Sequence, residues 1–350
     1  MELKELLKKA FELSGSDIFI VPGAKVTCKV KGDMVPLTDD IVKPAVTEQL
    51  VHEAYELAGR DVAKLRAEGD DDFSFALPGL SRFRCNAYIQ RGTVAATCRM
   101  VAFGLPDPKT LGVPDMVMDL TKNRNGMILV TGPAGSGKST TLACMIDRIN
   151  QERHGHIVTL EDPIEYIHHH KQSLVSQRDV PNDVPTFARA LRAALRQAPD
   201  VILLGEMRDL ESIRIAITAA ETGHLLLSSL HTTGAAKTVD RILDTFPAEQ
   251  QAQVRMQLSM VLRAVVSQRL VPKKDGGQVA VFEVMTVNPA VQNLIRDGRT
   301  HQIDNAIFGG AGQGMISMDG ELQRLFRAGV ITREVALTYA VSPETLSKRL

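Results

Sequence analysis

The chain carries a glycine-rich stretch whose spacing suits the binding of phosphate groups. Gly132 is followed, after four residues, by Gly137, Lys138 and Ser139. Glycines let the backbone turn so that successive N–H groups point at one phosphate, and a following helix adds its positive end. Lys138 would reach the terminal phosphates, and the Ser139 hydroxyl would bind Mg²⁺. We expect a nucleotide-phosphate loop made of Gly132, Pro133, Ala134, Gly135, Ser136, Gly137, Lys138, Ser139 and Thr140.

A second candidate element is a hydrophobic run that ends in a carboxylate. The run Val201–Leu204 is followed by Gly205 and Glu206. An acid at the carboxyl end of a central strand falls beside a phosphate loop. Glu206 could therefore hold Mg²⁺ and help to polarise an attacking water. A surface acid at a strand end is the alternative interpretation.

Three more carboxylates crowd the end of another predicted strand. They are Glu161, Asp162 and Glu165. Attack of water on a γ-phosphate needs a base or an orienting group. Like charges held close together raise the pKa of one of them, which suits that role. Solvation of a loop and helix capping would explain each acid taken singly.

Two histidines flank a further predicted strand at Leu225–Ser229. His224 precedes this strand and His231 follows it. Either could contact the γ-phosphate, or relay its state to a neighbouring subunit. A hydrogen-bonded structural role is the alternative for both. The consecutive residues 168–170 are also histidines, and we expect them to form a solvated loop because they cannot all face one metal ion.

Alternating strand and helix patterns position these residues. The predicted strands are Met127–Thr131, Ile157–Glu161, Val201–Gly205 and Leu225–Ser229, and the predicted helices are Ser139–Gln151, Pro185–Arg196 and Leu210–Thr222. Such alternation indicates a largely parallel α/β sheet. From about Ala248 the pattern is mainly helical, with a short hairpin near Val271–Phe282.

The first hundred residues predict a small α+β domain. Its strands are expected at Asp17–Val21, Val26–Val30, Phe73–Leu77, Arg82–Ile89 and Val94–Met100, and its helices near Leu3–Ala10 and Thr47–Ala58. The acidic run at residues 70–72 is interpreted as a solvated turn. Because Pro and Gly break helix and sheet, we expect a linker at 103–114 between domains at 1–102 and 115–350.

The composition excludes several classes of protein. Lys+Arg and Asp+Glu both number 41, aromatic residues are 4% and Trp is absent, which disfavours a nucleic-acid binder. The four cysteines lack the spacing of a zinc site. The sequence shows neither a signal peptide nor an apolar run long enough to span a membrane. We expect a cytoplasmic protein whose membrane role, if any, depends on partners.

Four motifs in this order resemble the secretion ATPase superfamily and, within it, the PilT group of ATPases that retract type IV pili in twitching motility. GPAGSGKSTT, TLEDPIEYIH, PDVILLGEMRD and ETGHLLLSSLHT resemble the family's Walker A, Asp box, Walker B and His box. VQNLIRDGRTHQIDNAI and GMISMDGEL resemble stretches of the retraction group. The resemblance implies an α/β fold with a RecA-like P-loop ATPase core and a smaller N-terminal PAS-like α+β domain.

The resemblance also implies a homohexamer that hydrolyses ATP with Mg²⁺ at subunit interfaces. The N-terminal domain would donate arginines to the triphosphate, and Arg82, Arg84 and Arg99 match these positions. Ordinary surface arginines on strands are the alternative. The implied partners are an inner-membrane pilus platform protein and a paralogous pilus ATPase, with no nucleic acid. The protein would then be cytoplasmic and peripherally associated with the inner membrane.

The stretch of this chain that begins at Val291 reads VQNLIRD and so departs from the family's AIRNLIRE signature. A principal motor, an accessory PilU-like motor and a divergent paralogue therefore stay open. A pilus-assembly or type II/IV secretion ATPase is an alternative function, against which the short N-terminal region and the missing paired cysteines argue. Two further alternative functions are a nucleotide-binding regulator that does not turn over ATP and a motor that acts on DNA. The zero net charge disfavours the DNA motor.

Overall fold

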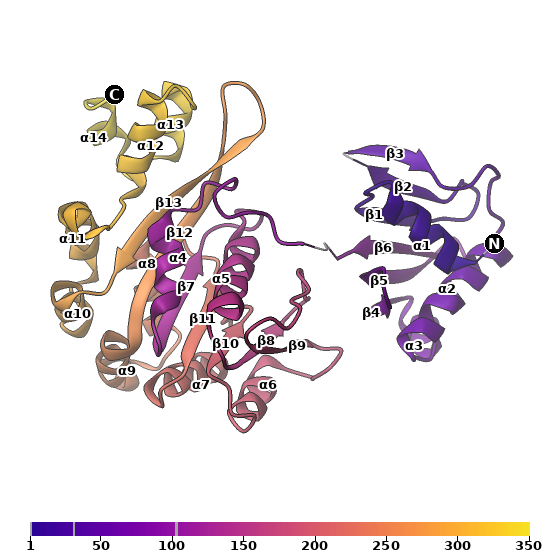
Figure 1. Cartoon of the computed structure of the whole chain (residues 1–350), viewed down its shortest axis with the longest axis horizontal. Helices are drawn as coiled ribbons and strands as arrows, with labels where there is room; N and C mark the ends of the chain where they lie inside the picture. Colours follow the sequence, from indigo (N-terminus) through magenta and orange to yellow (C-terminus); the bar gives the residue numbers. More distant parts are fainter. Residues whose placement is uncertain (1, 31, 102–103) are drawn as a thin grey trace. The chain divides into compact units, whose positions relative to one another are not determined.

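The computed structural model describes residues 2–30, 32–101 and 104–350, and it divides the chain into two compact units (Figure 1). One unit runs up to Gly104 and includes Glu165–Ile167, and the other comprises Leu105–Ile164 and His168–Leu350. The predicted domain end at residue 102 and the first linker position, 103, lie outside the described residues. Residues 105–114 of the predicted linker belong to the second unit.

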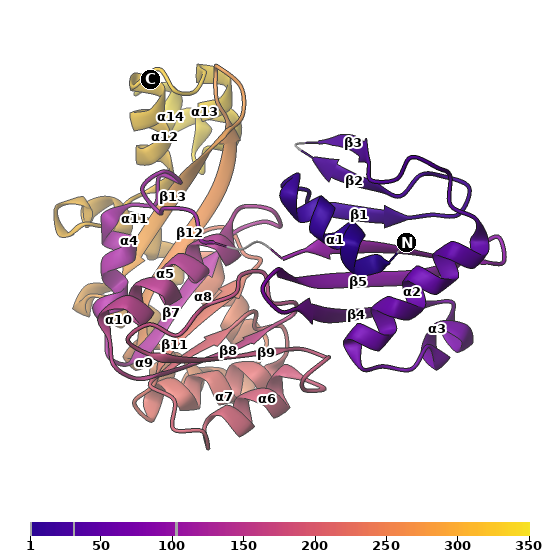
Figure 2. The same ribbon diagram turned by 45° about the vertical axis from the view of Figure 1, so that its right-hand side comes forward.

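The first unit is a six-stranded antiparallel sheet in the order β3-β2-β1-β6-β5-β4, with helices α1 and α2 over one face (Figure 2). Its elements are α1 Leu3–Glu12, β1 Asp17–Ile20, β2 Thr27–Val30, β3 Asp33–Pro36, α2 Pro44–Ala58, α3 Ala63–Glu68, β4 Asp70–Leu77, β5 Ser81–Gln90 and β6 Thr93–Met100. Side chains alternate across a strand, so Phe83 and Cys85 of β5 are buried while Arg82 and Arg84 lie on the other face.

The acidic run at residues 70–72 is not the solvated turn that we predicted, because it begins strand β4. Asp71 is fully buried. Its carboxylate accepts hydrogen bonds from the Tyr55 hydroxyl at 3.1 Å and from Lys64 Nζ at 3.0 Å, and Arg60 Nη2 lies 3.4 Å away. Burial, together with the charge of Asp71, raises the pKa of Tyr55. The alternation of β4 thus turns one acid of the three into the core, where basic side chains compensate its charge.

The second unit is a seven-stranded sheet in the order β13-β12-β7-β11-β10-β8-β9. All neighbouring strands are parallel except β12 and β13. The strands are β7 Gly126–Thr131, β8 His156–Glu161, β9 Leu174–Asp179, β10 Val201–Leu204, β11 Leu225–Leu230, β12 Leu262–Pro272 and β13 Gln278–Thr286. This arrangement confirms the predicted α/β class with a largely parallel sheet.

Helices cover both faces of the second sheet. Met127 and Leu129 of β7 pack in a core with α6, α7 and α9, whereas Ile128 and Val130 pack with α4 and α5. The helices are α4 Asp115–Asp119, α5 Lys138–Glu152, α6 Phe187–Ala194, α7 Leu210–Glu221, α8 Ala235–Asp244, α9 Ala248–Val261, α10 Pro289–Arg296, α11 Ile303–Gly309, α12 Met318–Arg327, α13 Arg333–Tyr339 and α14 Pro343–Ser347. Burial on two faces explains why these strands read as continuous apolar runs. In the described part of the chain, no helix is both long and apolar enough to cross a membrane.

The predicted hairpin near Val271–Phe282 is present as β12 and β13, but its strands are longer than we predicted. Helix α9 ends at Val261, and the eleven-residue strand β12 follows directly and pairs in parallel with β7. The predicted turn is present, since Lys273 N–H donates to the Gly277 carbonyl at 3.1 Å. Arg263, Ser267, Gln268 and Arg269 interrupt the apolar residues of β12, so its sequence shows neither a continuous apolar run nor a strict alternation.

We expect Asp71→Ala to destabilise the first unit by about 1–3 kcal/mol, because the buried Tyr55 hydroxyl loses its partner. Asp72→Ala is the matched control, since Asp72 is the exposed neighbour on the same strand, and its cost should stay below about 0.5 kcal/mol. Amide hydrogen exchange along β4 would measure both changes. Equal protection in the two variants would contradict the account of Asp71.

Candidate nucleotide-phosphate site

The predicted phosphate loop lies between strand β7 and helix α5. Helix α5 begins at Lys138, directly after Gly137, which has a left-handed backbone with φ of 89°. Gly132, at the other end of the loop, has φ of 146°. A side chain at Gly132 would collide with the Gln268 carbonyl oxygen and approach Ser136 Oγ to 2.7 Å. The two glycines that the spacing singled out are therefore required by the backbone itself.

The loop holds donors that suit a phosphate. Lys138 is buried, and its ammonium group donates to the carbonyls of Gly132 and Pro133, each at 3.0 Å. The Ser136 hydroxyl is also buried and has no hydrogen-bond partner within the described residues. A buried hydroxyl without a partner costs free energy, which an oxygen of a bound phosphate would recover. The Ser139 side chain is exposed at the first turn of α5.

Glu206 and His231 lie together at the carboxyl edge of the sheet. Glu206 is 9% exposed, and its carboxylate forms an ion pair with Arg208 Nε at 2.6 Å. Its second oxygen lies 3.7 Å from His231 Nε2. His231 follows β11, which is the strand between β10 and β7, so this acid and this histidine share an edge with the phosphate loop. The structure brings these two predicted residues together.

Glu161 ends strand β8 at the same edge. Its carboxylate accepts hydrogen bonds from Thr159 Oγ1 at 2.6 Å and from Gln177 Nε2 at 3.2 Å. A side chain at Gly205 would lie 3.3 Å from the Glu161 Cα, so the ends of β8 and β10 are in close contact. Asp162 follows and is exposed. Glu165 belongs to the first compact unit, and its role stays a prediction.

The structure does not bring His224 to the phosphate loop. Strands β7 and β11 are parallel, with Gly126 paired to Leu225 and Thr131 to Leu230. His224 therefore lies at the amino edge of the sheet, about 20 Å from His231 at ~3.3 Å per residue. Its Nδ1 donates to the Ala219 carbonyl at 2.9 Å, at the end of α7. Direct contact between His224 and a phosphate on this loop was a wrong prediction, and a relay to a neighbouring subunit stays a prediction.

The three consecutive histidines also differ from the predicted solvated loop. His168 is buried, and burial lowers its pKa to about 4, so it is neutral at pH 7. Only His169 and His170 are exposed. Residues 2–30, 32–101 and 104–350 contain no cluster of three or more His, Cys, Asp or Glu side chains able to hold a metal ion.

The predicted arginines lie on one face of the first unit's sheet. Arg84 on β5 is directly opposite Arg99 on β6. Arg99 forms an ion pair with Asp17 at 2.7 Å, and Arg82 donates to Ser74 Oγ at 2.7 Å. Arg84 has no hydrogen-bond or ion-pair partner in the described part of the chain. Two guanidinium groups thus face each other with one carboxylate to balance them.

Two residues of the site were missed from the sequence, Ser267 and Gln268 on β12. Ser267 Oγ lies 2.7 Å from Thr131 Oγ1, and Gln268 Oε1 accepts from Thr141 Oγ1 at 2.7 Å. Both residues are buried against the phosphate loop. Only a weak signal in the sequence marks them, because Arg263 and Arg269 also interrupt the apolar residues of Leu262–Val271.

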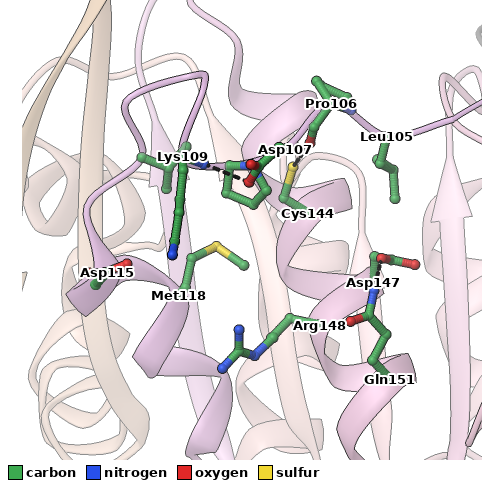
Figure 3. A pocket seen from close by; sticks show the side chains of 12 residues that line it. Leu105, Pro106, Asp107, Lys109, Asp115, Met118, Cys144, Asp147, Arg148 and Gln151 are labelled. Atoms are coloured by element: carbon green, nitrogen blue, oxygen red, sulfur yellow. Dashed lines mark hydrogen bonds between the residues drawn. The ribbon is translucent and has the colours of Figure 1, made fainter.

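Helix α5 also forms one wall of a cavity of about 360 Å³ (Figure 3). The other wall comes from the segment that leads to α4, where Pro106 O lies 3.5 Å from Cys144 Sγ. Burial raises the pKa of Cys144 to about 11, so this thiol is not reactive at pH 7. Charged residues of both signs line the cavity, namely Asp107, Lys109, Asp115, Asp147 and Arg148.

Comparison with known proteins defines the family. The model of the family described as "Type II/IV secretion system protein" matches residues 2–320. The chain belongs to this family. It is 43% identical over 346 residues to the type IV pilus retraction ATPase PilT of Pseudomonas aeruginosa, covering 98% of this chain and 99% of PilT. It is 39% identical over 348 residues to the type IV pilus ATPase PilU of the same organism, covering 99% and 90%.

A solved structure extends the likeness to three dimensions. The crystal structure of the pilus retraction motor PilT with bound ADP matches with a TM-score of 0.91 and 44% identity, over 99% of both chains. The match to the family model and the structural likeness to PilT confirm the predicted fold, which is a P-loop core with a smaller α+β unit.

We expect Gly132→Ala to cost about 3 kcal/mol, because its new methyl group must displace the β12 backbone. Gly135→Ala is the matched control. Gly135 also has a positive φ, but a Cβ there would meet no atom within 4 Å, so only about 1 kcal/mol of backbone strain is expected. Thermal unfolding and calorimetric titration with pyrophosphate would measure stability and binding. Equal losses in the two variants would contradict the close contact at Gly132.

Proposed function

We propose that the chain is a Mg²⁺-dependent ATPase that powers retraction of type IV pili, acting as a homohexamer. The observation that carries this proposal is the phosphate loop with Glu206 and His231 at one sheet edge. This site belongs to a chain that is similar over 98% of its length to a protein named as a pilus retraction ATPase. The proposed parts are an N-terminal domain at 1–102, a linker at 103–114 and an ATPase domain at 115–350.

Binding of ATP would use groups that the folded loop holds in place. The Lys138 ammonium would exchange the carbonyls of Gly132 and Pro133 for phosphate oxygens. The Ser136 hydroxyl would gain the partner that it lacks. Ser139 and Glu206 would hold Mg²⁺, which supplies positive charge to the terminal phosphates when it is bound. These residues thus bind and orient the triphosphate before any bond breaks.

The acidic residues would position the attacking water. Glu161 is held by Thr159 and Gln177, so its carboxylate is suited to orienting rather than to moving. Asp162 and Glu165 follow it in the chain, and either one could accept the proton from water. His231 lies beside Glu206, and we propose that it responds to the charge at the γ-phosphate position.

Arginines of the N-terminal domain would neutralise charge that develops on the transferred phosphoryl group. The opposed pair Arg84 and Arg99 supports this proposal, because like charges directly across a strand pair are destabilising and Asp17 compensates only Arg99, so a phosphate would offset the charge of Arg84. Arg82 lies on the same face of β5. These arginines would act on the triphosphate of their own subunit or on that of a neighbouring subunit.

Retraction also implies partners and a location. We propose that the hexamer works on an inner-membrane pilus platform protein, with a paralogous pilus ATPase as a further partner and no nucleic acid. The protein would be cytoplasmic and peripherally associated with the inner membrane. An accessory PilU-like motor is a second candidate function, because the identity to PilU, at 39%, is close to that to PilT.

The direct test is made in the source organism. The gene is deleted, either wild type or Lys138→Ala is restored, and surface pili and surface motility are measured. Retraction predicts excess pili and lost motility in the deletion strain. Wild type should correct both defects, whereas Lys138→Ala should correct neither. An exposed lysine of the same unit, changed in Lys237→Ala, serves as a matched control and should restore motility.

Two other outcomes would contradict the proposal. Cells without pili would indicate a pilus-assembly ATPase. Unchanged pili and motility would indicate an accessory motor or a secretion role.

A further inference from the structure

Strand β12 places one unusual side chain under the phosphate loop, that of Gln268. The residue is 4% exposed. Its carboxamide oxygen accepts a hydrogen bond from Thr141 Oγ1 at 2.7 Å. The neighbouring Ser267 interacts with both Thr131 and the Gly234 N–H group.

Gln268 contacts the loop at both of its ends. Its backbone carbonyl occupies the space where a side chain of Gly132 would lie. Its carboxamide nitrogen lies 2.8 Å from the position of a Cβ on Gly137. One residue of β12 therefore packs against the first and the last glycine of the loop. Because Gly137 immediately precedes α5, the same residue also fixes where that helix begins.

The hydrogen bond to Thr141 sets the direction of the carboxamide. Thr141 lies in the first turn of α5, where its N–H group donates to the Gly137 carbonyl at 3.0 Å. With its oxygen committed to Thr141, the carboxamide turns its N–H donors toward the loop. A displacement of this amide would release the first turn of α5, whose N–H groups attract phosphate.

We infer that Gln268 is a positioning residue for nucleotide binding, acting through Thr141 on the loop and on the first turn of α5. This inference rests on the proposed function of the loop as an ATP site. Gln268 holds the loop amides in the arrangement that receives phosphate, so its loss weakens nucleotide binding more than it slows the chemical step. The role differs from simple packing, because an apolar side chain of the same length cannot replace the hydrogen bond.

The test combines Gln268→Met, Thr141→Val and the double variant in the full chain. The dissociation constant of fluorescently labelled ADP is measured beside the rate of phosphate release at saturating ATP. Each single variant should weaken ADP binding about tenfold, the equivalent of one hydrogen bond at 1.4 kcal/mol per factor of ten. The rate at saturation should fall less than about twofold. Because both changes remove the same bond, the double variant should bind no more weakly than either single one.

Controls separate positioning from a general loss of stability. Gln253→Met changes an exposed glutamine of α9 and should leave both readouts at wild-type values. Thr141→Ser keeps the hydroxyl group and should restore most of the binding that Thr141→Val loses. If Gln268→Met does not fold, the pair Thr141→Val and Thr141→Ser tests the same bond from the helix side.

The results that would overturn the inference are distinct from failure of the proposed function. Unchanged ADP binding in Gln268→Met with a lower melting temperature would assign Gln268 a packing role alone. A double variant that binds about a hundredfold more weakly would show that the two residues act independently. Absence of ADP binding by the wild-type chain would instead contradict the proposed ATPase function.

Discussion

The structure of the second unit depends on one close approach, that of Gly132 to the Gln268 carbonyl. A phosphate loop needs a backbone that turns inward, and here it turns over strand β12 with no room for a side chain. Strand β12 must therefore lie beside β7, as the seven-stranded sheet places it. Lys138 fills the loop from within by bonding to its carbonyls. These contacts hold the loop within the second unit's own fold, and a loop held in this way loses less entropy on binding a ligand.

Parallel strand order then determines which polar residues can act together. Carboxyl ends of neighbouring parallel strands meet at one edge, and this edge collects Glu161, Glu206 and His231. The same rule sends His224 to the opposite edge, although only seven positions separate the two histidines in the sequence. Its hydrogen bond to the end of α7 gives it a local structural role.

The sequence predicted the elements that carry a local signal. Strand β7, the loop and α5 were predicted from a hydrophobic run, glycine spacing and a helical pattern, and the neighbouring strands β8, β10 and β11 from similar runs. Strand β12 was predicted only at its end, within the hairpin near Val271–Phe282, because Arg263, Ser267, Gln268 and Arg269 interrupt its apolar residues. Gln268 was missed for a different reason: its partner Thr141 is 127 positions away in the chain. Asp71 shows the same limit, since its burial depends on tertiary contacts with Tyr55 and Lys64.

We propose that Glu206 serves catalysis at a loop that binds nucleotide without it. The most direct measurement compares wild type with Glu206→Gln for ADP affinity and for phosphate release from ATP, with Glu211→Gln as an exposed control on α7. The account predicts affinity within about threefold of wild type and phosphate release slowed at least about a hundredfold, the scale of a lost acid–base or metal-holding group. Phosphate release at the wild-type rate by Glu206→Gln would contradict it.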